Sequence, residues 1–193
     1  MIRKKSNGWT IGCKLGVLIV LSILVGYSIW RLPDLQKIIY PYPHRAVVDK
    51  YAAEYGVDPL FVLAVIREES KFLPQSESHK GAKGLMQLMP DTAKSVAESI
   101  GDKNYQDEDL LIPEKNIQYG TWYIASLQKM FANNLSLVIA AYNGGSGHVQ
   151  EWIKSGQIDP ENIRLEDIPF KETRDYVARV AASYQKYIKL YRP

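Results

Sequence analysis

Two adjacent carboxylates, Glu68 and Glu69, follow Arg67 at the end of the apolar run "LFVLAVI", residues 60–66. Carboxylates are seldom buried unless they are paired or take part in chemistry. A carboxyl group in an apolar environment keeps its proton to a higher pH, because burial disfavours the charged form. Such a group is suited to donate a proton near neutral pH. One of these two residues is therefore a candidate general acid.

Helical spacing distinguishes the two carboxylates, because successive residues of an α-helix are turned by about 100°. Glu69 lies seven residues after Val62 and three after Ile66, so it continues the apolar face. Glu68 lies toward the charged face, three residues before Lys71, which predicts a solvated ion pair. We therefore expect Glu69 to point toward the core or a cleft. The alternative is that the helix ends earlier and leaves Glu69 in solvent.

The helix that would carry Glu69 belongs to a chain whose apolar pattern is mainly helical. Alternating apolar runs are scarce, which predicts an all-α fold. Asp58 and Pro59 are typical of a helix cap and a first helical residue, so they predict where this helix starts. A small hairpin in the loop before Gly84 stays open. Other helices are expected over residues 45–55, 90–101, 113–132, 135–145 and 146–156 and from Glu172 onward, with loops over 71–83 and 102–112.

The basic character of the chain lies in its N-terminal part. Residues 1–45 hold seven Lys and Arg against one Asp, whereas residues 46–193 hold 17 Lys and Arg against 20 Asp and Glu. A protein that binds nucleic acid carries its basic patch on the folded part. The acidic balance of residues 46–193 therefore argues against a nucleic-acid partner.

The N-terminus has the pattern of an export signal that stays attached. The chain begins "MIRKK", and residues 11–30 are apolar apart from Lys14. About 20 apolar residues span the core of a bilayer, and the preceding cations keep the N-terminus inside. We predict a single-pass signal anchor in the cytoplasmic membrane over residues 1–32, a linker over 33–44 and an extracytoplasmic domain over 45–193. A cleaved signal peptide is the alternative, although no small-residue cleavage site follows the run.

No metal-binding or phosphate-binding pattern accompanies the candidate acid in the sequence. The three histidines, His44, His79 and His148, are scattered, and no glycine-rich loop follows a predicted strand. The single cysteine, Cys13, falls in the apolar run, so the exported domain has no disulfide. We expect no cofactor and no metal.

Five segments of the exported part resemble the motif set of soluble-lytic-transglycosylase-type (SLT) catalytic domains, which are lysozyme-like, murein-cleaving enzymes. They occur in the family's order within residues 45–191 and read "EESKF", "SHKGAKGLMQLMPDTA", "PEKNIQYGTWYI", "AAYNGG" and "ETRDYV". The resemblance implies a helical fold of the goose-type lysozyme class with a glycan-binding cleft. In that family the catalytic Glu directly precedes a Ser, which here implies Glu69 followed by Ser70. The helical spacing had selected the same residue.

The resemblance also implies a reaction that uses a single carboxyl group. Glu69 would protonate the glycosidic oxygen between N-acetylmuramic acid and N-acetylglucosamine, while the substrate's acetamido group stabilises C1. The Glu69 carboxylate would then take a proton from the muramoyl C6 hydroxyl, which closes on C1 and leaves a 1,6-anhydromuramoyl end. The resemblance implies peptidoglycan glycan strands as partners, and the apolar run over residues 11–30 predicts the cytoplasmic membrane as a further partner.

The matching motifs also imply a set of substrate-binding residues. These residues are Ser70, Ser78, Gly84, Gln87, Met89, Tyr142, Asn143, Glu172 and Tyr176. Three have a structural alternative: Met89 as core, Asn143 as a helix cap and Glu172 as a carboxylate favoured at a helix start. The chain departs from the usual family pattern at Gly144, where Ala is common, and at Leu73, where Asn is common. These departures bear on the details of the subsites and not on the reaction.

Two other functions fit the same motifs. A hydrolytic muramidase of the same fold would use water and a second carboxylate across the cleft. An inactive scaffold of the cell envelope would bind glycan strands without cleaving them. The sequence candidates for a second carboxylate are Asp102, Asp107, Glu108, Asp109 and Glu114.

Overall fold

The chain forms two compact units, Met1–Pro41 and Tyr42–Pro193. The computed structural model describes the backbone of residues 8–30 and 33–192 and the side chains of 14–28 and 35–192. All the buried apolar residues of this described part lie in the second unit, so the second unit holds the packed core.

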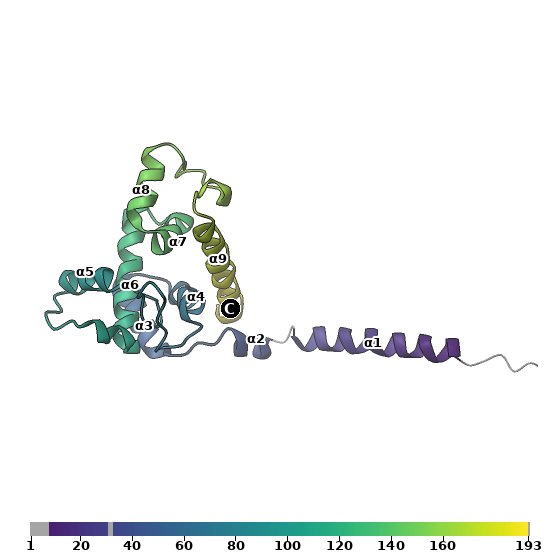
Figure 1. Cartoon of the computed structure of the whole chain (residues 1–193). Coiled ribbons are helices and arrows are strands. Elements are labelled where there is room, and N and C mark those ends of the chain that lie inside the picture. Colours follow the sequence, from purple (N-terminus) through teal and green to yellow (C-terminus); the bar gives the residue numbers. More distant parts are fainter. Residues whose placement is uncertain (1–7, 31–32, 193) are drawn as a thin grey trace, which may run out of the picture. The chain divides into compact units, whose positions relative to one another are not determined.

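The first unit contains the helices α1 (Gly8–Trp30) and α2 (Pro33–Ile39) (Figure 1). In α1 the apolar side chains from Leu15 to Val25 are each more than half exposed. Across the described residues, we find no helix with the combined length and apolarity that crossing a membrane requires. The helix α2 lies within residues 33–44, where we expected a linker and did not predict a helix.

The second unit is mainly helical, as the sequence predicted. Its elements are α3 (Arg45–Tyr55), α4 (Pro59–Ser70), α5 (Pro90–Ile100), η1 (Asp107–Leu111), α6 (Pro113–Met130), α7 (Leu135–Gly144), α8 (Ser146–Lys154), η2 (Leu165–Asp167) and α9 (Lys171–Tyr191). Each helix predicted after residue 44 forms close to its expected bounds. The short 3-10 helix η1 lies within residues 102–112, where only loop was predicted.

Helix α4 is the central helix that carries the candidate acid. The Asp58 side chain accepts a 2.9 Å hydrogen bond from the backbone N–H of Leu60, and Pro59 occupies the first turn, so the helix starts as predicted. The residues from Leu60 to Ile66 are all buried. Because this run is apolar on every side, α4 is stable only where other helices enclose it.

Helix α9 packs along α4 and also contacts α7 (Figure 1). Apolar and aromatic residues at helical spacing form a stripe on α9 that is buried at Tyr176, Val177, Val180 and Tyr187. This packing places the first half of α9 against the end of α4, where the two carboxylates lie.

A long loop between α4 and α5, residues 71–89, covers the same end of α4. No strand forms in the described residues of this unit, and only isolated antiparallel bridges join Lys83 to Glu77 and to Leu88. These bridges take the place of the hairpin considered before Gly84. The loop therefore needs contacts from other elements to hold its shape.

Candidate active site

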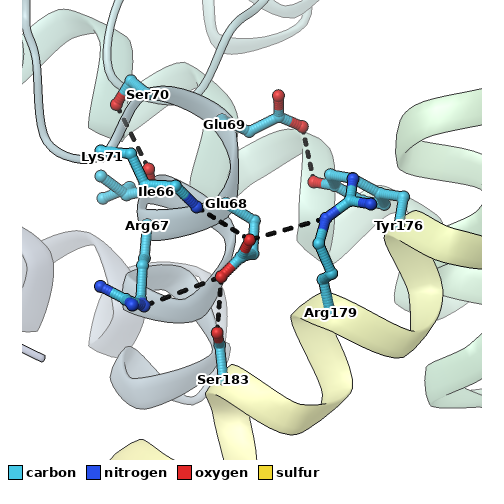
Figure 2. Close-up of polar contacts among 9 residues, drawn as sticks. All are labelled: Ile66, Arg67, Glu68, Glu69, Ser70, Lys71, Tyr176, Arg179 and Ser183. Carbon is cyan, nitrogen blue, oxygen red and sulfur yellow. Dashed lines mark hydrogen bonds and ion pairs between the residues drawn. The ribbon is translucent and has the colours of Figure 1, made fainter.

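Glu69 lies in the last turn of α4 and lines a cavity of about 620 Å³. The hydroxyl of Tyr176, from α9, donates a 2.5 Å hydrogen bond to Oε1 of Glu69 (Figure 2). Burial raises the pKa of Tyr176 well above its usual value, so the phenol stays protonated and remains the donor. The other carboxyl oxygen of Glu69 points away from Tyr176 in Figure 2. A proton on Glu69 is therefore carried by this second oxygen.

The environment of Glu69 is suited to both acid and base chemistry. Burial raises the pKa of Glu69 to about 7, against the opposing effects of the Tyr176 hydrogen bond and the charge of Arg179. Near neutral pH the carboxyl group is divided between its two protonation states. The prediction that Glu69 points inward is confirmed, and the alternative of an early helix end is wrong because α4 continues to Ser70.

Glu68, in contrast, is not the solvated carboxylate that helical spacing predicted. Its side chain is only 7% exposed, because α9 packs over this side of α4. The predicted ion pair with Lys71 forms at 2.9 Å, and Ser183 and Arg179 of α9 add a 2.6 Å hydrogen bond and a 3.7 Å ion pair (Figure 2). Burial raises the pKa of Glu68, but the Ser183 hydrogen bond and the contacts with Lys71 and Arg67 outweigh it and hold the pKa below its usual value. Glu68 is therefore a buried, charged residue.

The buried side chain of Asn116, in α6, holds the loop that covers the site. Its Oδ1 accepts a 2.7 Å hydrogen bond from the N–H of Met86, and its Nδ2 donates to the carbonyls of Lys83 at 3.0 Å and Leu110 at 2.9 Å. We did not identify Asn116 from the sequence. Asn116 lies within the segment "PEKNIQYGTWYI", but helical periodicity does not show that its side chain contacts a loop 30 residues earlier.

Ser70 was expected to bind substrate, and the structure places it behind the cavity wall. The side chain is buried, and its hydroxyl donates to the carbonyls of Leu85 at 2.7 Å and Ile66 at 3.2 Å. Ser70 does not line the cavity. It instead joins the end of α4 to the loop beside it.

Gly84 also lies outside the cavity wall. Its φ is 79°, and a Cβ at this position would clash with the carbonyl oxygen of Leu110 and the side chain of Asn116. Gly84, which was expected to bind substrate, instead lies close to these two protein groups. The glycine is needed so that the loop can pack against α6.

The cavity brings together most of the residues that the motifs singled out. Those that line it are Glu69, Ser78, Gln87, Met89, Tyr142, Asn143 and Glu172. Tyr176 does not line it but contacts Glu69 through its hydroxyl. The residues come from α4, α7, α9 and the loop before α5, so helix packing assembles the site from segments far apart in the sequence.

The structure bears on the three structural alternatives, which were Met89 as core, Asn143 as a helix cap and Glu172 as a carboxylate at a helix start. Met89 is 41% exposed, so it is not core. Asn143 lies inside α7, which is capped by Gly145, and its Oδ1 accepts a 2.9 Å hydrogen bond from Thr173. Glu172 lies in the first turn of α9, as its structural alternative expects, and its side chain also lines the cavity.

The polar groups of Tyr142 and Gln87 form hydrogen bonds to backbone carbonyls of the loop over residues 71–89. The Tyr142 hydroxyl donates a hydrogen bond to the carbonyl of Met86 at 2.7 Å. Gln87 has a φ of 47°, and its Nε2 donates to the carbonyls of Ser76 at 3.0 Å and Gly84 at 2.9 Å. Both residues therefore shape the wall that they line.

The cavity is also lined by residues that we did not select from the sequence. These residues are His79, Lys80, Ala82, Gly144, His148, Phe170 and Thr173. Phe170 is 44% exposed and packs edge-on against Trp152 and His148, with ring centroids 5.0 and 5.2 Å apart. Exposed aromatic rings are typical of sites that bind the apolar faces of sugars. The position of Phe170 just before the "ETRDYV" segment was the available signal.

The sequence candidates for a second carboxylate lie elsewhere. None of the five, all within the described residues, lines the cavity. Asp102 pairs with Lys115, and Glu114 pairs with Lys50 at 3.2 Å. Besides the candidate acid, Glu172 is the carboxylate in the cavity wall among the described residues. Over residues 8–30 and 33–192, no group of three or more His, Cys, Asp and Glu side chains is arranged to hold a metal ion.

Comparison with known proteins finds the same domain in bacterial murein enzymes. The transglycosylase SLT domain model matches residues 46–164. The soluble lytic murein transglycosylase of Escherichia coli K12 is 36% identical over 153 residues, which are 77% of this chain and 24% of the relative. The membrane-bound lytic murein transglycosylase C of Edwardsiella ictaluri is 33% identical over 192 residues, 88% of this chain and 53% of the relative.

A solved structure extends this similarity to the fold. An inactive mutant of the lytic transglycosylase Slt from Pseudomonas aeruginosa aligns with a TM-score of 0.71 and 34% identity, over 79% of this chain and 25% of that one. The helical fold is therefore lysozyme-like, as expected. The chain spans only about a quarter to a half of the length of these relatives. Because the family model covers more than half of the chain, the chain belongs to the transglycosylase SLT domain family.

Proposed function

We propose that the protein is a peptidoglycan lytic transglycosylase. It cleaves the β-1,4 bond between N-acetylmuramic acid and N-acetylglucosamine without water and leaves a 1,6-anhydromuramoyl end. The observation that carries the proposal is the placement of Glu69 at the cavity, with its pKa raised to about 7 and one oxygen held by Tyr176. The family and the names of the relatives, which are lytic murein transglycosylases, support the same reaction.

In the first step Glu69 acts as the acid. Its protonated oxygen, on the side away from Tyr176, donates to the glycosidic oxygen of a strand bound in the cavity. The bond between C1 and that oxygen breaks, and the acetamido group of the muramoyl residue stabilises C1. The Tyr176 hydrogen bond stabilises the carboxylate that this step produces.

In the second step the Glu69 carboxylate acts as the base. It takes the proton of the muramoyl C6 hydroxyl, whose oxygen then bonds to C1. This returns the proton to Glu69 and displaces the acetamido oxygen, so no water is consumed. A pKa of about 7 suits a group that performs both steps near neutral pH.

The remaining cavity residues are proposed to bind the glycan strand. Ser78, Gln87 and Met89 line the wall formed by the loop, while Asn143 and Glu172 line the wall formed by α7 and α9. No cofactor or metal takes part in the proposed steps.

A hydrolytic muramidase is the second candidate, favoured by the presence of Glu172 in the cavity wall. In that reaction Glu172 would activate a water molecule against C1. The Glu172→Gln variant separates the candidates. It should still release anhydro ends if Glu172 only binds substrate, and it should lose cleavage altogether if Glu172 activates water.

The test of the proposed function is mass spectrometry of the fragments released from purified peptidoglycan. We expect muropeptides with anhydro ends, each lighter by one water than the hydrolysis product, and no release by Glu69→Gln. Reducing ends would support the muramidase. Binding of the strands without release of any fragment would support an inactive scaffold.

We further propose that residues 1–32 anchor the enzyme in the cytoplasmic membrane, with residues 11–30 in the bilayer and the catalytic domain outside. The cationic N-terminus and the exposed apolar side chains of α1 support this location. A membrane-bound relative is consistent with it. After separation of cell membranes, the full chain should stay in the membrane fraction through a high-salt and alkaline wash. Its release by that wash would contradict an anchor.

A further inference from the structure

Glu68 lies at the centre of a charge cluster that the proposed reaction does not use. Its carboxylate is 2.9 Å from Nζ of Lys71, 3.7 Å from Nε of Arg179 and 3.7 Å from Nε of Arg67 (Figure 2). Ser183 donates a further 2.6 Å hydrogen bond. A buried carboxylate with this many partners is charged, so it offsets part of the cationic charge around the end of α4.

The same cations also act on the neighbouring Glu69. The Arg179 guanidinium lies 5.9 Å from the ring centroid of Tyr176, whose hydroxyl binds Glu69. The positive charges of Arg179 and Lys71 lower the pKa of Glu69, whereas the negative charge of Glu68 raises it. Without Glu68, the cations would favour the Glu69 carboxylate and remove the proton that the acid step needs.

We propose that Glu68 is a positioning residue that holds Arg179 and Lys71 in ion pairs and offsets their charge, so that Glu69 keeps its proton where the enzyme works. This inference rests on the proposed role of Glu69 as the acid. It gives the two adjacent carboxylates opposite states and linked roles: Glu68 stays charged, and Glu69 is thereby kept available as an acid.

The groups that face Glu69 come from several elements. Lys71 follows α4, Tyr176 and Arg179 belong to α9, and Tyr142 belongs to α7. The titratable residues in the rest of the cavity wall are His79, Lys80, His148 and Glu172. These wall residues are the same in every variant compared below, so a difference between variants reports on Glu68 and its partners.

The test measures the rate of fragment release from peptidoglycan against pH, with the full chain. The rate should fall as the pH rises through the pKa of Glu69, because the acid step needs the proton. In Glu68→Gln this alkaline limb should move to lower pH, because the variant removes the negative charge that raises the pKa of Glu69. The glutamine keeps the size of the side chain and can still accept the Ser183 hydrogen bond.

Arg179→Gln provides the opposite change, since it removes a cation. Its alkaline limb should move up in pH, and the double variant should return toward the wild-type profile. The Arg179 side chain is 53% exposed, so this variant should fold. Lys189→Gln, in the last turn of the same helix, is the matched control and should leave the profile unchanged.

The inference is tested by the directions in which Glu68→Gln and Arg179→Gln move the alkaline limb of the pH–rate profile. A role in folding alone would lower the amount of active protein without moving the limbs in opposite directions. Unmoved limbs, or limbs that move the same way in both single variants, would overturn the proposal. If Glu68→Gln fails to fold, an alkaline limb of Arg179→Gln at the wild-type pH would also overturn the proposal. Activity retained by Glu69→Gln would instead overturn the proposed function itself.

Discussion

The hydroxyl of Tyr176 and Oε1 of Glu69 lie 2.5 Å apart, although 107 positions separate the two residues in the sequence. The contact exists because α9 packs along α4 and its buried residue Tyr176 faces the end of the shorter helix. It fixes the orientation of the carboxyl group and determines which of its oxygens faces the substrate.

Tyr176→Phe tests whether this hydrogen bond takes part in catalysis. Loss of a hydrogen bond to a carboxylate costs about 1.5 kcal/mol or more, so we expect the rate to fall about tenfold or more. Because the hydrogen bond lowers the pKa of Glu69, the alkaline limb should also move to higher pH. The pH–rate profile of fragment release measures both effects.

Tyr184→Phe is the matched control for this variant. Tyr184 lies on the same helix and donates a 2.6 Å hydrogen bond to Asp58, at the other end of α4. It should reduce stability and leave the alkaline limb in place. An equal shift of the limb in both variants would show that the effect comes from helix packing in general.

The raised pKa of Glu69 also predicts a stability difference that depends on pH. The pKa rises from 4.5 to about 7 on folding, so the folded state binds more protons between these values. The associated stabilisation is complete below about pH 4.5 and is lost as the pH rises through about 7. Glu69→Gln has no such ionisable group and keeps its stability over this range. Between pH 4 and pH 8 its free energy of unfolding should therefore rise by about 2 kcal/mol relative to that of the wild type.

Denaturant unfolding of the full chain at a series of pH values measures this difference. Glu161→Gln, which changes an exposed carboxylate, serves as the control and should follow the wild type at every pH. A constant difference between Glu69→Gln and wild type across the range would contradict burial as the cause of the raised pKa.

Gly84→Ala and Gly81→Ala together test why the loop needs Gly84. Both residues have a positive φ, 79° and 86°, but only at Gly84 would a Cβ meet other atoms. Gly81→Ala should cost about 1 kcal/mol of strain. Gly84→Ala should cost about 3 kcal/mol or more, because Leu110 and Asn116 must shift. Thermal unfolding checks this, and equal losses would mean that close packing at Gly84 is unimportant.

Asn116→Ala should destabilise the loop that covers the site. It removes the hydrogen-bond partner of the buried N–H of Met86 and of the Leu110 carbonyl, and one of the two partners of the Lys83 carbonyl, at a cost of about 3 kcal/mol or more. Gln118→Ala, on the same helix, loses only a 3.4 Å contact with Tyr55 and should change little. Thermal unfolding together with the rate of fragment release compares the two.

Local pattern was sufficient for most of the fold and for the candidate acid. The cap at Asp58, the apolar run of α4 and the stripe of α9 each depend on neighbours within a few residues, which sequence periodicity records. The same periodicity placed Glu69 on the inward side of its helix. The η1 turn was missed because its acidic residues are typical of a solvated loop.

Contacts between elements that lie far apart in the sequence could not be predicted from helical periodicity. Glu68 was predicted to be solvated because the pattern of one helix does not show that α9 covers its charged edge. Gly84 was assigned to the sugar for a similar reason, since its real neighbours, Leu110 and Asn116, lie well beyond its loop. The resemblance to the family predicted the substrate-binding residues. Tertiary packing determines which of them line the cavity.

The central claim is that Glu69 cleaves the glycan without water, and cleavage in water labelled with heavy oxygen tests it most directly. Mass spectrometry of the newly formed muramoyl ends should show anhydro ends that contain no label. A Glu69→Gln protein with unchanged helical content should release no fragments. Reducing ends that carry one heavy oxygen atom would contradict the account and identify the enzyme as a hydrolase.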